Sequence, residues 1–95
     1  MTHRLLLAAA AALALCAPAA GAAPAHITAA LADTSRPAAE KSRDAVRKAS
    51  ETLEISGVAP GAKVVDLIMG GGYFTRLLSA AVGPKGEVIA YQPAE

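Results

Sequence analysis

The chain has 95 residues, and its 9 basic and 8 acidic side chains give a net charge of +1 at neutral pH. This length allows one small domain, and the balanced charge gives no strong field to hold nucleic acid or an anionic membrane surface. One cysteine and two histidines exclude an intrachain disulfide framework, a metal centre and a Ser-His-Asp triad.

Residues 1–25 have the pattern of an export signal. A basic start at Arg4 precedes an apolar stretch from Leu5 to Cys16, which Pro18 and Gly21 then break. The stretch is shorter than the roughly 20 residues that span a bilayer, so no stable membrane span is expected. The sequence predicts export, to the periplasm in a bacterium, with cleavage after Ala20, Ala23 or Ala25. Two alternatives are an uncleaved alanine-rich helix and a lipoprotein signal acylated at Cys16.

The next segment is expected to be irregular. Residues 26–36 are polar and mixed, show no sustained apolar period, and predict a flexible arm.

Residues 37–56 predict a helix, with Pro37 in its first turn and an apolar stripe at Val46, Ala49 and Leu53. Gly57 ends it.

Charged side chains are expected on the surface of this predicted helix. Asp44 and Lys48 stand four residues apart, in the order that favours an ion pair along a helix. The basic side chains are expected to form a solvated face: Arg36, Lys41, Arg43, Arg47 and Lys48.

Residues 63–91 predict one βαβ unit. The run from Lys63 to Ile68 is typical of a buried parallel strand, and three glycines follow it. A stripe of helical period comes next, and Glu87–Tyr91 predicts a second strand. The stripe consists of Phe74, Leu77, Leu78, Ala81 and Val82. The fold class is therefore α/β, with parallel strands joined by a right-handed crossover.

The glycine loop is the candidate ligand site. Ligands of open α/β sheets bind beyond the carboxyl ends of the strands, where Gly70, Gly71 and Gly72 stand. Glycine admits a ligand against bare backbone, the next helix offers unpaired N–H groups, and Asp66 can meet a cation. The alternative is that the glycines only form a tight turn. The loop lacks the Lys-Ser/Thr of a P-loop, which argues against a nucleoside triphosphate.

The segment from Val64 to Thr75 resembles motif I of class I S-adenosylmethionine-dependent methyltransferases. The shared features are an aliphatic pair, an acidic residue, a glycine loop and Tyr-Phe-Thr. Pro60–Lys63 and Val82–Val88 are similar to the flanks of that motif, and Arg47–Val58 resembles the lead-in of a bacterial, signal-bearing group of putative methyltransferases. The resemblance implies that residues 37–95 are the N-terminal part of a Rossmann-like methyltransferase domain with an incomplete sheet.

The resemblance also implies site roles. Asp66 would bind the methionine ammonium of S-adenosylmethionine, Gly70 and Gly72 would let the donor approach the backbone, and Gly71 lies between them. Gln92 stands where the family has an acid that accepts both ribose hydroxyls. Ile68 replaces the first motif glycine; because a β-branched residue resists positive φ, the loop is expected to turn later or differently.

Several functions remain open. The main hypothesis is methyl transfer to an unknown acceptor, by a chain that is a fragment and inactive alone. The alternatives are a non-catalytic binding domain on the same scaffold and a dinucleotide oxidoreductase. A homo-oligomer that buries the bare sheet is one way for such a short chain to be stable.

Overall fold

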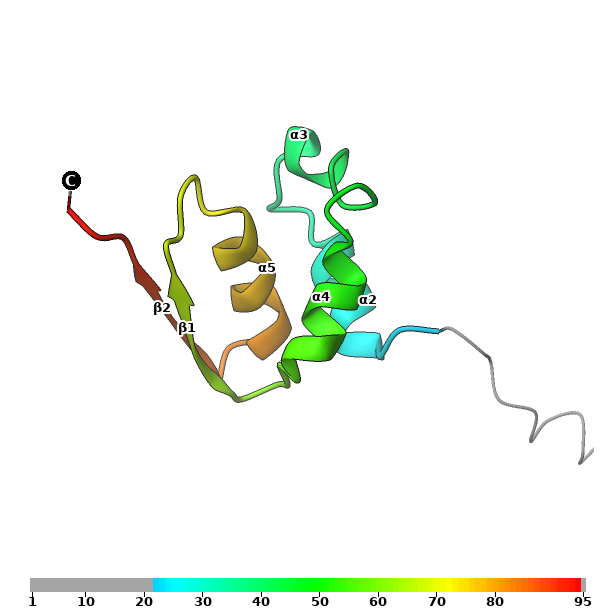
Figure 1. Cartoon of the computed structure of the whole chain (residues 1–95). Coiled ribbons are helices and arrows are strands. Elements are labelled where there is room, and N and C mark those ends of the chain that lie inside the picture. Colours follow the sequence, from blue (N-terminus) through cyan, green and yellow to red (C-terminus); the bar gives the residue numbers. More distant parts are fainter. Residues whose placement is uncertain (1–21, 95) are drawn as a thin grey trace, which may run out of the picture.

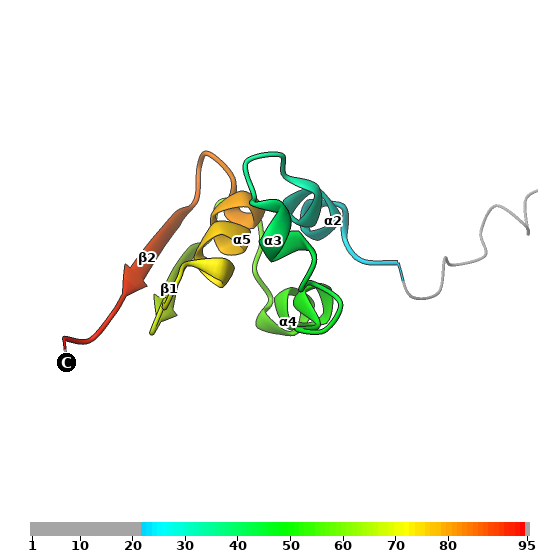
Figure 2. The ribbon, with the colours of Figure 1, turned by 90° about the horizontal axis from the view of Figure 1, so that it is seen from above.

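The computed structural model describes residues 22–94 as a three-layered α/β unit (Figures 1 and 2). Seen from above in Figure 2, helix α5 lies between the sheet and the pair α2 and α4. The elements in chain order are α2 (Ala25–Ala32), α3 (Ala38–Lys41), α4 (Ala49–Ser56), β1 (Lys63–Leu67), α5 (Tyr73–Val82) and β2 (Glu87–Tyr91). The export signal expected over residues 1–25 lies mostly outside the described residues and stays a prediction.

The βαβ unit confirms the predicted α/β fold class. β1 and β2 pair in parallel, with Val65 opposite Ile89, and α5 begins and ends where the apolar stripe predicts. Gly86 allows the return turn to pack tightly, because a Cβ there would lie 2.3 Å from the Cβ of Val82. Two paired strands with helices on one face form a partial Rossmann-like unit.

The flexible arm predicted over residues 26–36 is wrong for residues 26–32, which belong to α2. This helix buries Ile27 and Ala30 against α4 and α5, and the His26 ring nitrogen Nε2 lies 2.8 Å from the Val58 carbonyl oxygen. Helix α2 is short and half of its residues are alanine, so its apolar pattern is weak. Tertiary packing, rather than a local signal, therefore explains the helix.

The single helix predicted over residues 37–56 is wrong in its middle. Residues 42–48 form turns between α3 and α4, and Lys48 takes the left-handed conformation at φ 51°. Ala49 and Leu53 are buried as the stripe predicts, but Val46 is 86% exposed. The break turns the chain so that Asp44 faces Arg36 instead of pairing with Lys48.

The helices leave one face of the sheet bare. Val64, Asp66 and Val88 on the α5 side of the sheet are partly buried, whereas Val65, Leu67, Ile89 and Tyr91 on the other side are exposed. The sheet is thus open on one face, as expected of an incomplete Rossmann-like sheet. No helix within residues 22–94 has the length and apolar character needed to cross a bilayer.

Candidate functional site

The glycine loop between β1 and α5 turns at Ile68. Ile68 has φ 60°, followed by Gly70 at 55° and Gly72 at 88°, so the expectation that isoleucine would delay the turn is wrong. Two hydrogen bonds hold this conformation: the Met69 N–H donates to the Tyr91 carbonyl at 3.0 Å, and the Gly72 N–H donates to the Met69 carbonyl at 3.0 Å. The surrounding backbone therefore imposes a left-handed conformation on a β-branched residue, at an energetic cost.

Replacing Ile68 with glycine should raise the free energy of unfolding by about 1 kcal/mol, because the left-handed strain exceeds the entropy that glycine loses on folding. The Ile68 side chain is 69% exposed, so little packing is lost with it. Urea denaturation measures the change. Ile68→Ala is the matched control, since alanine keeps the Cβ that causes the strain. An equal gain in both variants would contradict the strain argument.

Asp66 lies on β1 just before the loop, on the side of the sheet that α5 covers. Its carboxylate is half-buried and accepts a hydrogen bond from the Thr75 hydroxyl, with 2.6 Å between Oγ1 and Oδ2. Thr75 belongs to the first turn of α5, so the bond ties the strand end to the helix start. The carboxylate is held in a fixed position at the mouth of the loop, as a cation-binding group requires.

The three candidate glycines differ in what surrounds them. A Cβ at Gly70 or Gly71 would meet nothing within 4 Å, so the backbone there is open to a ligand. At Gly72 a Cβ would lie 3.0 Å from Nη1 of Arg76, which covers this glycine. The backbone N–H groups of Gly71 and the first residues of α5, Tyr73, Phe74 and Thr75, form no hydrogen bond within the described part of the chain.

Gln92 reaches the same loop from the end of β2. Its side-chain carbonyl Oε1 accepts a hydrogen bond from the Gly70 N–H at 3.0 Å. The structure thus joins the two positions that the sequence places at the ends of adjacent strands. One oxygen of Gln92 is engaged by the loop, and its two amide N–H donors remain to face a ligand.

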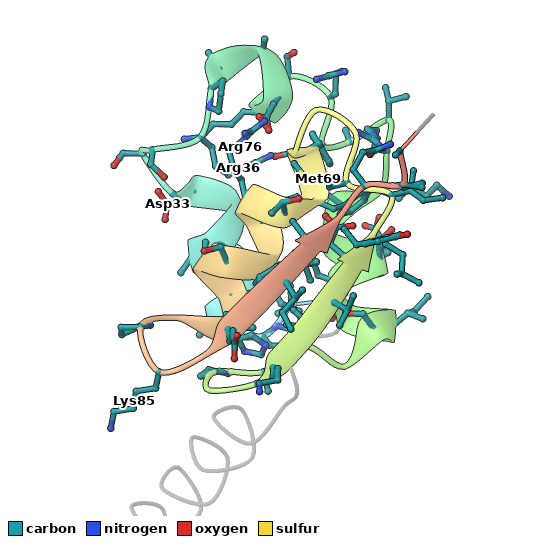
Figure 3. The ribbon with its side chains drawn as sticks, turned by 90° about the vertical axis from the view of Figure 1, so that its left-hand side faces the viewer. Asp33, Arg36, Met69, Arg76 and Lys85 are labelled. Carbon is teal, nitrogen blue, oxygen red and sulfur yellow. The ribbon has the colours of Figure 1, made fainter. Side chains whose placement is uncertain are left out.

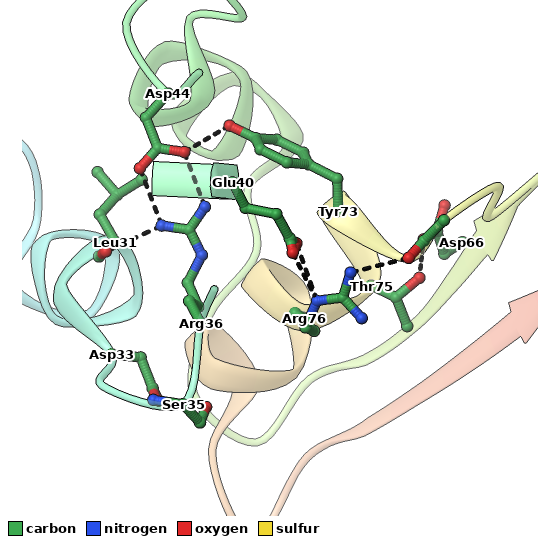
Figure 4. A network of polar contacts seen from close by, with 11 residues as sticks. Leu31, Asp33, Ser35, Arg36, Glu40, Asp44, Asp66, Tyr73, Thr75 and Arg76 are labelled. Carbon is green, nitrogen blue, oxygen red and sulfur yellow. Dashed lines mark hydrogen bonds and ion pairs between the residues drawn. The ribbon is translucent and has the colours of Figure 1, made fainter. Parts of the chain in front are cut away.

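Arg76 connects the loop to the helical segment before β1 (Figures 3 and 4). Its Nε lies 2.8 Å from both oxygens of Glu40, and its Nη2 donates to the Gly71 carbonyl at 2.8 Å. Figure 3 shows Arg76 and Met69 at the end of the molecule where the strands finish, and Lys85 at the other end. No local sequence pattern indicates a role for Arg76, because its partner Glu40 lies 36 residues earlier in the chain.

A second polar cluster lies beside the first. Arg36 has a fully buried side chain, and its two terminal nitrogens donate to Asp44 at 2.7 and 2.8 Å (Figure 4). The Tyr73 hydroxyl donates to the same carboxylate at 2.5 Å, and Arg47 stacks on the Tyr73 ring with 4.2 Å between guanidinium carbon and ring centroid. The solvated face expected for the basic residues is therefore wrong for Arg36, although Arg43, Arg47 and Lys48 are exposed.

These contacts shift the pKa values of the partners. The Arg36 guanidinium lowers the pKa of the Asp44 carboxyl, and the Arg76 guanidinium lowers the pKa of Glu40. Burial, followed by the bond to Asp44, raises the pKa of the Tyr73 hydroxyl. Both carboxylates are thus charged at neutral pH, and Tyr73 remains a hydrogen-bond donor.

Stability should fall in acid because of these two carboxylates. Their folded-state pKa values lie below the unfolded values of about 4, so the unfolded chain binds protons first as the pH drops. Their contribution is complete above about pH 5 and is lost as the pH falls through the folded pKa values. Urea denaturation between pH 7 and pH 2 measures this. Glu40→Gln should lower stability at pH 7 and flatten the acid dependence; an unchanged acid slope would contradict it.

Neither a metal site nor a hollow lined by the predicted site residues is found at the loop in the described part of the chain. Within residues 22–94, no three histidine, cysteine or acidic side chains come together to hold a metal ion. A hollow of about 470 Å³ borders Arg76, but the predicted site residues do not line it. Its lining is Asp33, Ser35, Arg76, Ser79, Ala80, Gly83 and Pro84. The loop with Asp66 and Gln92 remains the candidate site.

Comparison with known proteins finds local similarity to methyltransferases. The chain is 50% identical over 38 residues to the ubiquinone/menaquinone biosynthesis C-methyltransferase UbiE of Ectopseudomonas mendocina, and 55% identical over 38 residues to that of Legionella pneumophila. The Shewanella sp. enzyme is 53% identical over the same length. Each match covers 40% of this chain and 15% of the relative. No protein-family model and no solved structure matches the chain. The similarity therefore relates one segment of the chain to methyltransferases.

Proposed function

We propose that the chain carries the donor-binding part of an S-adenosylmethionine-dependent methyltransferase, which transfers a methyl group to an acceptor. The observation that carries the proposal is the Asp66 carboxylate held at the mouth of an open glycine loop. The local identity of 50–55% to C-methyltransferases supports it independently. The match covers a small part of each relative, so the proposal concerns the donor and the reaction type.

The residues present fit this donor. S-adenosylmethionine supplies a methyl group on a sulfonium, together with an ammonium, a carboxylate and ribose hydroxyls. Asp66 offers a negative charge for the ammonium, and the open backbone of Gly70 and Gly71 allows the ligand to approach closely. The unpaired backbone N–H groups at the start of α5 offer hydrogen bonds to the ligand's carboxylate or hydroxyl groups. Gln92 faces the loop from the neighbouring strand. Alignment of donor and acceptor is the main demand of such a reaction, and a rigid loop serves it.

We also propose that catalysis needs structure beyond these elements. One face of the sheet exposes large apolar side chains, namely Val65, Leu67, Ile89 and Tyr91. Further structure is expected to pack on this face, because parallel sheets are stable when both faces are packed. Two hollows at the surface of the described elements, one beside Arg76 and one beside Lys85, are not lined by Asp66, Gly70 or Gln92. Donor binding, rather than turnover, is therefore the activity expected of this chain.

Calorimetric titration of the chain with S-adenosylmethionine tests the proposal. Binding that S-adenosylhomocysteine displaces and NAD leaves intact supports a methyltransferase. Displacement by NAD would point to a dinucleotide oxidoreductase. No binding at millimolar ligand would favour the second candidate, a non-catalytic binding domain on the same scaffold. That candidate is supported by Gln92, which lacks the charge of the family's acid and gives its carbonyl to Gly70.

Gln92→Glu should tighten S-adenosylmethionine binding about tenfold. One carboxylate oxygen would keep the bond from the Gly70 N–H, and the other would replace an amide donor with a charged acceptor for ribose hydroxyls. Calorimetry measures the change. Gln92→Met, which removes the acceptor for Gly70, is the control and should weaken binding. Equal or weaker binding by Gln92→Glu would show that ribose does not reach this side chain.

A further inference from the structure

The guanidinium of Arg76 lies directly over the candidate donor-binding loop. Its Nη1 would be 3.0 Å from a Cβ on Gly72, and its Nη2 bonds to the Gly71 carbonyl. The positively charged guanidinium therefore covers Gly72, whereas Gly70 and Gly71 have no side chain over them. A side chain in this position is part of the surface that a ligand on the loop would meet.

The donors of Arg76 are only partly used. Glu40 occupies Nε, and the Gly71 carbonyl occupies Nη2, whereas Nη1 has no hydrogen-bond partner within residues 22–94. The Glu40 side chain is 6% exposed and the Arg76 side chain is 44% exposed. Glu40 therefore holds the guanidinium from the buried side, and the uncommitted donors remain at the loop.

The surroundings favour an anion at this place. The two carboxylates nearest to Arg76 on the helical side already have cationic partners, since Glu40 is paired with Arg76 and Asp44 with Arg36. The unpaired N–H groups of Gly71 and Tyr73 add positive ends of backbone dipoles. An anionic ligand group would meet guanidinium and amide donors together, which is the arrangement that binds carboxylates well.

We propose that Arg76 recognises the carboxylate of the methyl donor's methionine moiety, with Glu40 as the residue that positions it. This inference rests on the proposed function and assigns to Arg76 a role that complements Asp66. The two side chains border the same loop with opposite charges, and the methionine moiety carries an ammonium and a carboxylate on one carbon. Arg76 thereby makes the site selective for a donor that retains its carboxylate.

Two ligands and one substitution test this selectivity. Decarboxylated S-adenosylmethionine keeps the sulfonium, the amine and the adenosine but lacks the carboxylate. By calorimetry, the full chain should bind S-adenosylmethionine at least tenfold more tightly than the decarboxylated compound. Arg76→Gln should weaken S-adenosylmethionine binding about tenfold, leave the decarboxylated compound within about twofold, and so abolish the preference.

Further variants separate recognition from folding. Arg76→Lys keeps a positive charge and should retain part of the preference, and Glu40→Gln should reduce it, because the guanidinium is no longer held. Arg47→Gln is the matched control, since Arg47 is exposed and stacks on Tyr73 without touching the loop carbonyls; it should leave the preference unchanged. Thermal melting confirms that each variant is folded.

The outcomes distinguish this inference from the proposed function. Equal binding of both ligands by the wild-type chain, or an intact preference in Arg76→Gln, would overturn the role of Arg76 and leave donor binding standing. Failure of the wild-type chain to bind either ligand would overturn the proposed function itself, and the inference with it. A variant that loses both ligands equally would assign Arg76 a structural role and overturn recognition.

Discussion

Replacing Asp44 with alanine should lower the free energy of unfolding by about 3–5 kcal/mol, enough to leave much of a small domain unfolded. The carboxylate is the partner of two groups, the fully buried Arg36 guanidinium and the Tyr73 hydroxyl. Alanine would leave a buried cation without its counter-charge and a buried hydroxyl without an acceptor. Urea denaturation followed by circular dichroism measures the loss.

Two comparisons make this prediction specific. Asp33→Ala is the matched control: its carboxylate accepts hydrogen bonds from Ser35 in an exposed turn, so its loss should cost far less than the loss of Asp44. Combining Arg36→Met, Asp44→Leu and Tyr73→Phe removes the charges and the hydroxyl together and should recover part of the loss. If the triple variant is as unstable as Asp44→Ala, packing rather than unpaired charge holds this region together.

The βαβ unit could be predicted because its signals are local. The β-branched run before the glycines and the stripe from Phe74 to Val82 place both β1 and α5, and Glu87–Tyr91 gives β2 with the observed bounds. In each case a few consecutive residues carry the hydrophobic period that the fold then buries. The structure adds the register, which no single strand determines by itself.

The helical part was harder to predict because its order depends on residues far apart in the chain. The break at Lys48 has no glycine or proline to announce it, and the stripe through Val46 continues past it without interruption. The contacts that fix residues 36–44 come from Tyr73 and Arg76, some 30 residues later. Periodicity cannot reveal a buried ion pair, since arginine usually indicates solvent.

In the candidate site, too, some residues could be predicted from local sequence patterns and others depend on tertiary contacts. Asp66, Gly70 and Gln92 could be located from the sequence, because strand ends and glycine loops have recognisable patterns, and the structure brings Gly70 and Gln92 into contact. Arg76 could not, since helix position alone does not show that its guanidinium folds back over Gly72. The left-handed φ of Ile68 was also hidden, because side-chain preference opposed it and the Met69–Tyr91 hydrogen bond prevailed.

Asp66→Asn should weaken S-adenosylmethionine binding by about 2–3 kcal/mol, a factor of roughly 30 to 150 in Kd. Asparagine keeps the size of the side chain and an oxygen that can accept from Thr75, so the loop remains in place while the negative charge is lost. Calorimetry measures the change. Thr75→Val is the control: it frees the carboxylate without removing its charge and should weaken binding only a few-fold. A loss in Thr75→Val as large as that in Asp66→Asn would show that orientation, not charge, governs binding.

Ligands that lack one group at a time identify what Asp66 contacts. 5′-Methylthioadenosine has neither ammonium nor carboxylate, so its binding should be unchanged by Asp66→Asn. Decarboxylated S-adenosylmethionine retains the amine and should lose as much affinity as the full donor. Arg76→Gln should give the opposite pattern, weakening only the full donor. If Asp66→Asn weakens 5′-methylthioadenosine equally, the carboxylate supports the shape of the loop rather than the ammonium, and the donor must be oriented by other groups.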